Sequence, residues 1–189
     1  YHRNMNSRLE LCSLLVLSLL TGGGASADTR QAQVAGQFYP QERTKLLEAV
    51  TGLLERQPAP TIPDKPRILI VPHAGYPYSG PIAASGYRHL RGHAYDGVVV
   101  VGFTHRLQFA GSSVDSREAY ETPLGEIQVD QEAVAILKAS PGIVSREEAH
   151  ASGEHSLEVE LPFLQVSLER VKLVPILMGS ASLEDAKHL

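Results

Sequence analysis

The stretch Arg67-Ile-Leu-Ile-Val71, followed by Pro72-His-Ala-Gly-Tyr-Pro-Tyr-Ser-Gly80, decides how the fold of this chain is interpreted. Its apolar run is typical of a parallel strand that is buried on both faces. A second apolar run, Gly97-Val-Val-Val-Val-Gly102, follows after residues 80–90, which have helical character. This strand, helix, strand order predicts parallel pairing with a right-handed crossover. Ligands in such folds collect outside the carboxyl ends of the strands, which is where His73 lies.

Hydrophobic periodicity predicts the other elements and an α/β fold with a mixed, mainly parallel sheet and flanking helices. Helices are expected over residues 42–56, 80–90 and 131–140, and strands over residues 68–71, 98–101, 111–115, 119–122, 126–129 and 172–178. Four prolines between residues 58 and 66 predict an extended linker. Residues 155–168 carry a helical pattern that Pro162 either kinks or divides by opening a second helix.

The length of 189 residues and the hydrophobic content of 43% indicate one globular domain. The net charge of -4 comes with scattered Lys and Arg, so we expect no nucleic-acid partner, which would require a concentrated basic face. The pattern of residues 183–189 predicts the start of a helix without a C-terminal cap. We interpret residues 28–189 as a single domain that is incomplete at the C-terminus.

The N-terminal residues 1–27 are typical of a signal peptide. Arg8 supplies positive charge, residues 11–20 form an apolar core, and Ala25-Ser26-Ala27 predicts cleavage before Asp28. This core is shorter than the roughly 20 residues that span a bilayer, so no stable membrane span is expected. The protein would be secreted or periplasmic if the signal is used and cytoplasmic otherwise. Cleavage would remove Cys12, the single cysteine of the sequence, and would leave residues 28–189 without a disulfide or a thiolate ligand of their own.

Three of the eight histidines lie where a functional site is expected. His73 follows the first apolar run, His105 follows the second, and His155 opens a helical pattern after a polar loop. Imidazole is the commonest metal ligand and also moves protons near neutral pH. A structural role for each histidine stays open, because this spacing fixes no local geometry. His150, five residues before His155, either supports the site from behind or lies at the surface, and the surface position is favoured. His89, His93 and His188 are interpreted as surface residues.

The hydroxyl groups of Tyr76, Tyr78 and Ser79 lie directly after His73. They can line a pocket for a polar ligand, although buried tyrosines often bond only to backbone groups. This glycine-containing stretch lacks the Gly-x4-Gly-Lys-Ser/Thr pattern of a phosphate loop. Residues 153–156 also lack the Gly-x-Ser-x-Gly pattern of a nucleophile elbow, so Ser156 is a weak candidate for a nucleophile.

Five motifs together resemble the Memo-like family, whose bacterial members are called AmmeMemoRadiSam system protein B. They are Val34-Ala-Gly-Gln-Phe-Tyr-Pro40, Pro72-His-Ala-Gly-Tyr-Pro-Tyr-Ser-Gly80, Val101-Gly-Phe-Thr-His105, Tyr120-Glu-Thr-Pro-Leu-Gly125 and Glu154-His-Ser-Leu-Glu-Val-Glu-Leu-Pro-Phe-Leu164. The resemblance covers most of residues 34–180. It implies a fold like that of class III extradiol dioxygenases, with a metal pocket at the strand ends.

The resemblance implies roles for individual residues. His73 and His105 match the two metal-binding histidines of the family, with Fe(II) as the expected metal. His155 matches the pocket histidine with an acid-base role, and Glu154 joins Tyr76, Tyr78 and Ser79 as an expected pocket residue. The third metal ligand is expected in a C-terminal stretch beyond Leu189. A signal peptide departs from the mostly cytosolic family, and the bacterial family name implies a radical-SAM partner.

Three functions follow as hypotheses. The first is a non-haem iron oxidoreductase related to extradiol dioxygenases, with an unidentified small-molecule substrate. The alternative is a non-catalytic ligand-binding, peptide-binding or scaffold protein that uses the same pocket. A periplasmic metal-dependent hydrolase is the third, and it rests on the histidines and the export signal alone.

Overall fold

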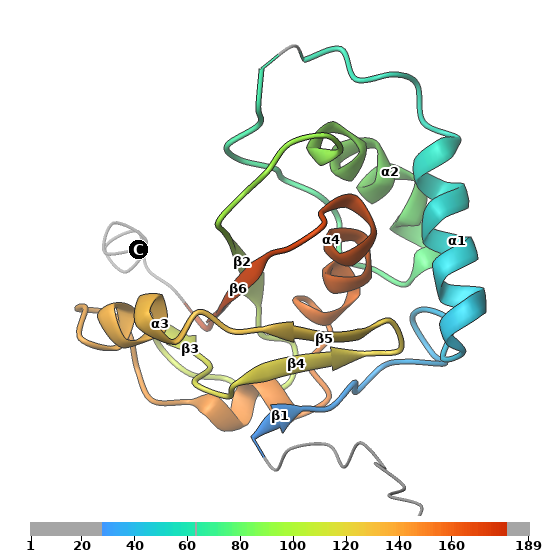
Figure 1. The fold of residues 1–189 in the computed structure, drawn as a ribbon. Helices are drawn as coiled ribbons and strands as arrows, with labels where there is room; N and C mark the ends of the chain where they lie inside the picture. The colour runs from blue at the N-terminus through green and yellow to red at the C-terminus, as the bar shows by residue number, and fades with distance from the viewer. Residues whose placement is uncertain (1–27, 63, 181–189) are drawn as a thin grey trace, which may run out of the picture.

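The fold is a mixed α/β arrangement in which two small sheets lie beside a group of helices (Figure 1). The computed structural model describes residues 28–62 and 64–180. The α-helices are α1 (Arg43–Glu55), α2 (Tyr76–Tyr87), α3 (Gln131–Lys138) and α4 (Leu161–Ser167), with short 3-10 helices η1 (Arg88–Leu90), η2 (Glu147–Ala151) and η3 (Glu158–Glu160). The strands are β1 (Thr29–Arg30), β2 (Gly97–Phe103), β3 (Ser112–Val114), β4 (Ala119–Thr122), β5 (Gly125–Gln128) and β6 (Lys172–Met178).

Each sheet contains one parallel and one antiparallel pair. In the sheet β2-β6-β3, strands β2 and β6 are parallel in the register Gly97↔Lys172 to Phe103↔Met178, and β3 runs antiparallel on the other edge of β6. In the sheet β1-β4-β5, β1 is parallel to β4 and β5 is antiparallel to it. The Asp130 backbone N–H donates to the Leu173 carbonyl at 2.8 Å and links the two sheets.

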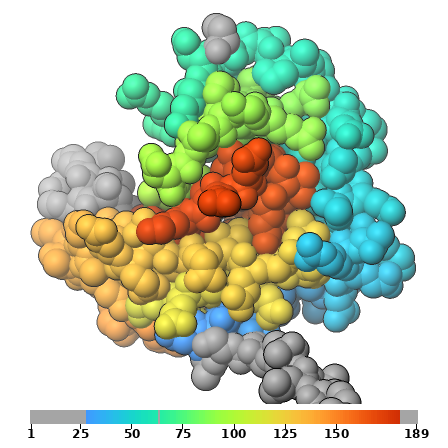
Figure 2. Space-filling view, viewed as in Figure 1, coloured from blue at the N-terminus to red at the C-terminus, as the bar shows by residue number. Residues whose placement is uncertain are grey.

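Helices α1, α2 and α4 pack together on one side of β2 and β6 (Figure 1). The space-filling view shows α4 and β6 between this helical layer and the layer that contains β4 and β5 (Figure 2). Leu46, Val50 and Leu54 of α1 are fully buried, and Tyr87 of α2 stacks on Phe163 of α4 at 5.1 Å between ring centroids. Burying each such side chain stabilises the fold by about 1.5–3 kcal/mol.

Most of the predicted elements are present. The periodicity over residues 42–56 corresponds to α1, the strand over residues 172–178 is β6, and the three short strands are β3, β4 and β5. Pro162 does not kink a longer helix: it lies in the first turn of α4, where its missing N–H has no intrahelical partner to lose. The sheet is mixed as predicted, but it is divided into two three-stranded sheets.

The predicted strand over residues 68–71 is wrong. The segment is extended, but it joins neither sheet, and Ile68 and Ile70 are 82% and 96% exposed. A strand requires a hydrogen-bonded neighbour, and the described residues supply none at this place. The helix predicted over residues 80–90 also differs, because α2 begins earlier, at Tyr76, and leaves the side chain of Ile82 63% exposed.

Two further predictions concern residues that the structure does not describe. The signal peptide over residues 1–27 and the helix start over residues 183–189 lie outside the described residues. Among residues 28–62 and 64–180, no helix has both the length and the apolar character needed to cross a membrane.

Candidate metal centre

His73, His105 and His155 meet in one cluster, although they come from three separate parts of the chain. Their potential ligand atoms all lie within 4.8 Å of one another. The ring centroids are 5.3 Å apart for His73 and His105, 4.5 Å for His105 and His155, and 6.0 Å for His73 and His155. The sequence prediction that these three residues share a site is consistent with this geometry.

The ends of neighbouring segments bring the histidines together. His105 lies two residues beyond β2, and the Thr104 N–H extends the ladder by donating to the Met178 carbonyl at 2.9 Å. His73 lies in the loop that enters α2, which is held by a 2.8 Å bond from the Tyr76 N–H to the Phe38 carbonyl. The Phe38 ring lies 4.5 Å from the ring of His155. Sequence reasoning did not select Phe38 as a site residue, although it stands in the first family motif.

Glu154 organises the cluster from a position with only 2% exposure. Its carboxylate accepts hydrogen bonds from the backbone N–H groups of His105, His155 and Ser156. One of its oxygens also lies 3.0 Å from His105 Nδ1. Because an ionised carboxylate only accepts hydrogen bonds, we assign the His105 proton to Nδ1, which leaves Nε2 with a free lone pair.

The pKa values in the site favour an anionic carboxylate beside neutral imidazoles. Burial alone would raise the pKa of Glu154, but the hydrogen bonds from His105, Ser156 and His155 outweigh it and lower the value to about 2. Burial lowers the pKa of His73, and the neighbouring His105 lowers it further. Burial also lowers the pKa of His155, against an opposing effect of Glu154. Neutral imidazole is the form that coordinates metals.

A buried ring nitrogen without a hydrogen-bond partner indicates that these residues fit a metal ion. His155 Nδ1 is buried and has no hydrogen-bond partner among the described residues; its distance of 3.6 Å from Glu154 is too long for a bond. A buried nitrogen without a partner costs free energy that an ion or a ligand proton can recover. Three imidazoles are a donor set that suits Fe, Zn, Cu or Ni, so the residues fit a transition metal.

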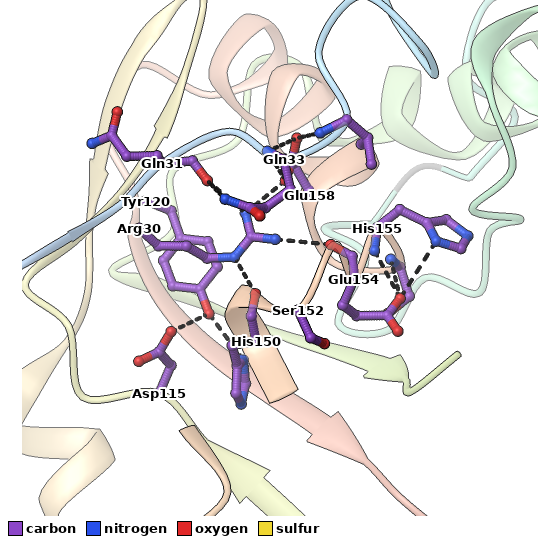
Figure 3. A network of polar contacts seen from close by, with 12 residues as sticks. Arg30, Gln31, Gln33, Asp115, Tyr120, His150, Ser152, Glu154, His155 and Glu158 are labelled. Atoms are coloured by element: carbon purple, nitrogen blue, oxygen red, sulfur yellow. Dashed lines mark hydrogen bonds and ion pairs between the residues drawn. The ribbon is translucent and has the colours of Figure 1, made fainter. Parts of the chain in front are cut away.

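A buried polar network supports this site from behind (Figure 3). Arg30 donates to the carbonyl groups of Glu154 and His150 and forms a 2.7 Å ion pair with Glu158. The carbonyl contact ties the backbone of Glu154 to β1 (Figure 3). Sequence reasoning missed Arg30 and Glu158 as supporting residues. Glu158 stands in a family motif, but nothing local links it to an arginine so distant in sequence.

The interpretation of His150 as a surface residue is wrong. Its side chain is 1% exposed, with Nδ1 at 3.0 Å from the Tyr120 hydroxyl and Nε2 at 3.2 Å from the Ser113 carbonyl. Burial lowers its pKa to about 4, so the ring is neutral in the fold. The polar residues around His150 favour an exposed position in a sequence-based prediction. In the fold, η2 places the His150 side chain against β3 and β4, which bury it.

The remaining predicted pocket residues lie near the cluster in sequence but differ in environment. The Tyr76 hydroxyl is buried and donates to the Val159 carbonyl at 3.0 Å, and the Ser79 hydroxyl donates to the Ala74 carbonyl at 2.9 Å. The Tyr78 side chain is 86% exposed. Their role in holding a ligand stays a prediction.

Comparison with known proteins gives the family of the chain. The family model described as Memo-like protein matches residues 30–189. Proteins named "MEMO1 family protein" are similar to the chain: the one from Methanobrevibacter smithii is 35% identical over 170 residues, 85% of this chain and 60% of its own length. The one from Pyrobaculum arsenaticum is 33% identical over 167 residues, which cover 85% of this chain and 59% of that protein. The one from Ignicoccus hospitalis is 38% identical over 160 residues, which cover 79% of this chain and 56% of that protein.

The chain therefore spans about three-fifths of the length of the curated relatives it matches. The match includes all three histidines of the cluster and Glu154, which lie within residues 30–189. Both the family model and the relatives lead to the same assignment. The chain belongs to the Memo-like protein family.

Proposed function

We propose that this chain contributes the metal-binding core of a non-haem iron oxidoreductase related to class III extradiol dioxygenases. The observation that carries the proposal is the cluster of His73, His105 and His155, with one buried ring nitrogen left unpartnered. Bound Fe(II) would supply a Lewis acid and a redox centre for oxygen chemistry. The substrate and the radical-SAM partner implied by the bacterial family name stay predictions.

The residues divide into three roles in this proposal. His73 and His105 hold the metal, and Glu154 fixes the orientation and tautomer of His105 through its 3.0 Å contact with Nδ1. His155 is neutral at pH 7 because its pKa lies below the usual 6.5, so it can accept a proton from a bound hydroxyl group. The Phe38 ring, 4.5 Å from the His155 ring, supplies an apolar contact beside the proton-accepting group.

A second assignment of His155 has its own support. Its potential ligand atom lies within 4.8 Å of those of His73 and His105, so it can serve as a third metal ligand. A complete ligand set of three histidines would then need no ligand from elsewhere in the protein. Both assignments predict metal binding and differ in what the loss of His155 does.

The test measures metal in protein that is reconstituted with Fe(II) under anaerobic conditions and desalted, by mass spectrometry of metals. We expect stoichiometric iron in the wild-type chain and loss of iron in His73→Ala and His105→Ala. His155→Ala keeps its iron if His155 moves a proton and loses it if His155 is a ligand. Oxygen consumption with catechol as a probe then separates a catalytic from a purely metal-binding site.

His93→Ala is the matched control, because His93 is a partly exposed histidine outside the cluster. It should bind iron as the wild type does. Stoichiometric iron in His73→Ala would contradict the proposal. Absence of iron in correctly folded wild-type chain would favour the non-catalytic binding protein instead.

A further inference from the structure

A groove of about 620 Å³ separates β2 from the extended segment before α2. Residues 66–71 form one wall, and residues 97–101 of β2 form the other. The floor contains Tyr87, Leu90 and Leu164, and His73 also lines the groove. The groove therefore lies beside the candidate metal centre but is formed mainly by two lengths of extended backbone.

Both walls leave backbone hydrogen-bonding groups unpaired toward the groove. Among the described residues, β2 pairs with β6 alone, and residues 67–71 pair with no strand. The segment is held in place by other contacts: the Tyr95 hydroxyl donates to the Pro66 carbonyl at 2.8 Å, and Val71 packs closely on Gly86 of α2. Strand β2 carries no charged residue, and an apolar strand edge of this kind is a template for another strand.

The side chains of the two walls alternate in the same way. Leu69 and Val71 on one wall, like Val98 and Val100 on the other, are buried or half-buried on the inner face. Their neighbours on the opposite face also line the groove but are exposed: Ile68 82%, Ile70 96%, Val99 57% and Val101 53%. Two walls with a matching period of two are typical of strands that flank a third.

Two polar atoms on the floor have no hydrogen-bond partner among the described residues, although the Glu160 carboxyl also forms a hydrogen bond with Tyr87. Ser156 Oγ and Glu160 Oε2 are buried, on residues that are 2% and 5% exposed, and both residues line the groove. Burying such atoms without a partner costs free energy. A molecule bound in the groove would recover it if it placed a hydrogen-bonding group against Ser156 and Glu160. An apolar small molecule would fill the volume but would leave these groups and both backbone edges unpaired.

We propose that the groove receives an extended, apolar β-strand with one inward hydroxyl or amide group, supplied by the part of the family's length that this chain does not span. That part amounts to about two-fifths of the relatives, since the match covers 59% to 60% of them. The strand would pair with β2 on one side and residues 67–71 on the other and would join them into one sheet. This inference does not depend on a bound metal.

The test uses the full 189-residue chain and overlapping synthetic peptides of about 12 residues, longer than a typical strand of about 5–6. The peptides cover the part of the Methanobrevibacter smithii relative that this chain does not match. We expect one group of overlapping peptides to bind and to slow amide hydrogen exchange at least tenfold in residues 67–71 and 97–103. Methylating alternate backbone nitrogens of that peptide should abolish binding, because strand addition depends on main-chain hydrogen bonds.

Ile70→Asp and Ile62→Asp form the matched pair of variants. Both positions are exposed isoleucines, but only Ile70 lines the groove, so Ile70→Asp should weaken peptide binding at least threefold and Ile62→Asp should not. Peptides from the relative can bind weakly because its sequence differs from that of this family member. Amide hydrogen exchange is therefore also measured on the chain fused to the unmatched part of the Methanobrevibacter smithii relative. No protection in either format would overturn the proposal. Protection of residues 97–103 that appears with rising protein concentration alone would assign the groove to a second copy instead.

Discussion

Arg30 and Glu158 form a buried ion pair in which each charge has the other as its counter-charge. The two side chains are 2% and 0% exposed and 2.7 Å apart. Glu158 also accepts hydrogen bonds from the Gln33 and Val34 N–H groups and the Tyr39 hydroxyl. Every oxygen of this carboxylate is therefore used, and the pair joins β1 and the loop after it to η3.

Replacing one partner of this pair should destabilise the chain more than replacing both. Glu158→Gln leaves the Arg30 charge buried without a counter-charge, and we expect a loss of about 3–5 kcal/mol in the free energy of unfolding. Arg30→Met combined with Glu158→Met removes both charges, so we expect it to cost less than Glu158→Gln alone. Urea unfolding measures both variants. The exposed pair Lys45–Glu42 supplies the control: Lys45→Gln should change stability by less than about 1 kcal/mol.

Glu154 is the second residue whose effect reaches beyond its own contacts. The backbone N–H of His105 faces one carboxylate oxygen of Glu154, and those of His155 and Ser156 face the other. In Glu154→Gln one of these oxygens becomes an NH₂ group that cannot accept, so the N–H groups on that side lose their acceptor. We expect Fe(II) affinity to fall by about 10- to 100-fold. The nitrogen chemical shifts of His105 should also show a change in tautomer, a readout that needs no metal. Glu148→Gln, at an exposed carboxylate, should change neither; an unchanged His105 tautomer in Glu154→Gln would refute the positioning role.

At the scale of elements, β2 carries a glycine because its inner face is crowded. A Cβ at Gly102 would collide with Ser156 Oγ and would lie 2.8 Å from Leu157 Cδ2. These atoms belong to the segment that follows His155. Gly102 thus allows the histidine-bearing loop to approach the strand that ends near His105.

Gly102→Ala should destabilise the chain by about 1–3 kcal/mol through overpacking. The matched change in the same strand is Gly97→Ala, whose Cβ would meet nothing closer than the Lys172 carbonyl oxygen at 3.4 Å. We expect Gly97→Ala to be neutral or slightly stabilising, because alanine reduces the entropy of the unfolded chain. Thermal unfolding distinguishes the two. Equal melting temperatures for both variants would show that the loop can move away at little cost.

At the scale of the whole molecule, the buried acid Glu160 makes stability depend on pH. Burial raises its pKa to about 8, from 4.5, against an opposing hydrogen bond from Tyr87. Between these two values the folded chain holds a proton that the unfolded chain has lost. The free energy of unfolding therefore receives a contribution from Glu160 that falls as pH rises from about 4.5 to about 8.

Glu160→Gln should remove this contribution. The stability of the variant relative to wild type should rise between pH 5 and pH 8, by on the order of 3 kcal/mol. His150, with a pKa lowered to about 4, contributes an opposite slope between about pH 4 and 6.5, but it is present in both proteins and cancels in the difference. Urea unfolding at several pH values checks this. Parallel stability curves for the two proteins would contradict it.

Much of the fold and of the site could be predicted because the signals are local. The apolar spacing that forms α1, the β-branched run of β2 and the period of β6 are each contained in one short window. His73, His105 and His155 were found for the same reason, since each follows or precedes an element whose type the sequence defines. The family motifs added their expected roles, and the structure brings the three rings together.

The sequence by itself determined most of the segments that are helical or extended and the three histidines that stand next to their ends. Only the tertiary structure decided that residues 68–71 have no strand partner, that His150 is buried and that Arg30 pairs with Glu158 across 128 residues. The physical reason is that periodicity reports the conformation of one segment, whereas burial and pairing depend on what another segment places beside it. Ile68 and Ile70 illustrate this: their apolar alternation favours an extended chain, and the neighbouring strand is what the described residues lack.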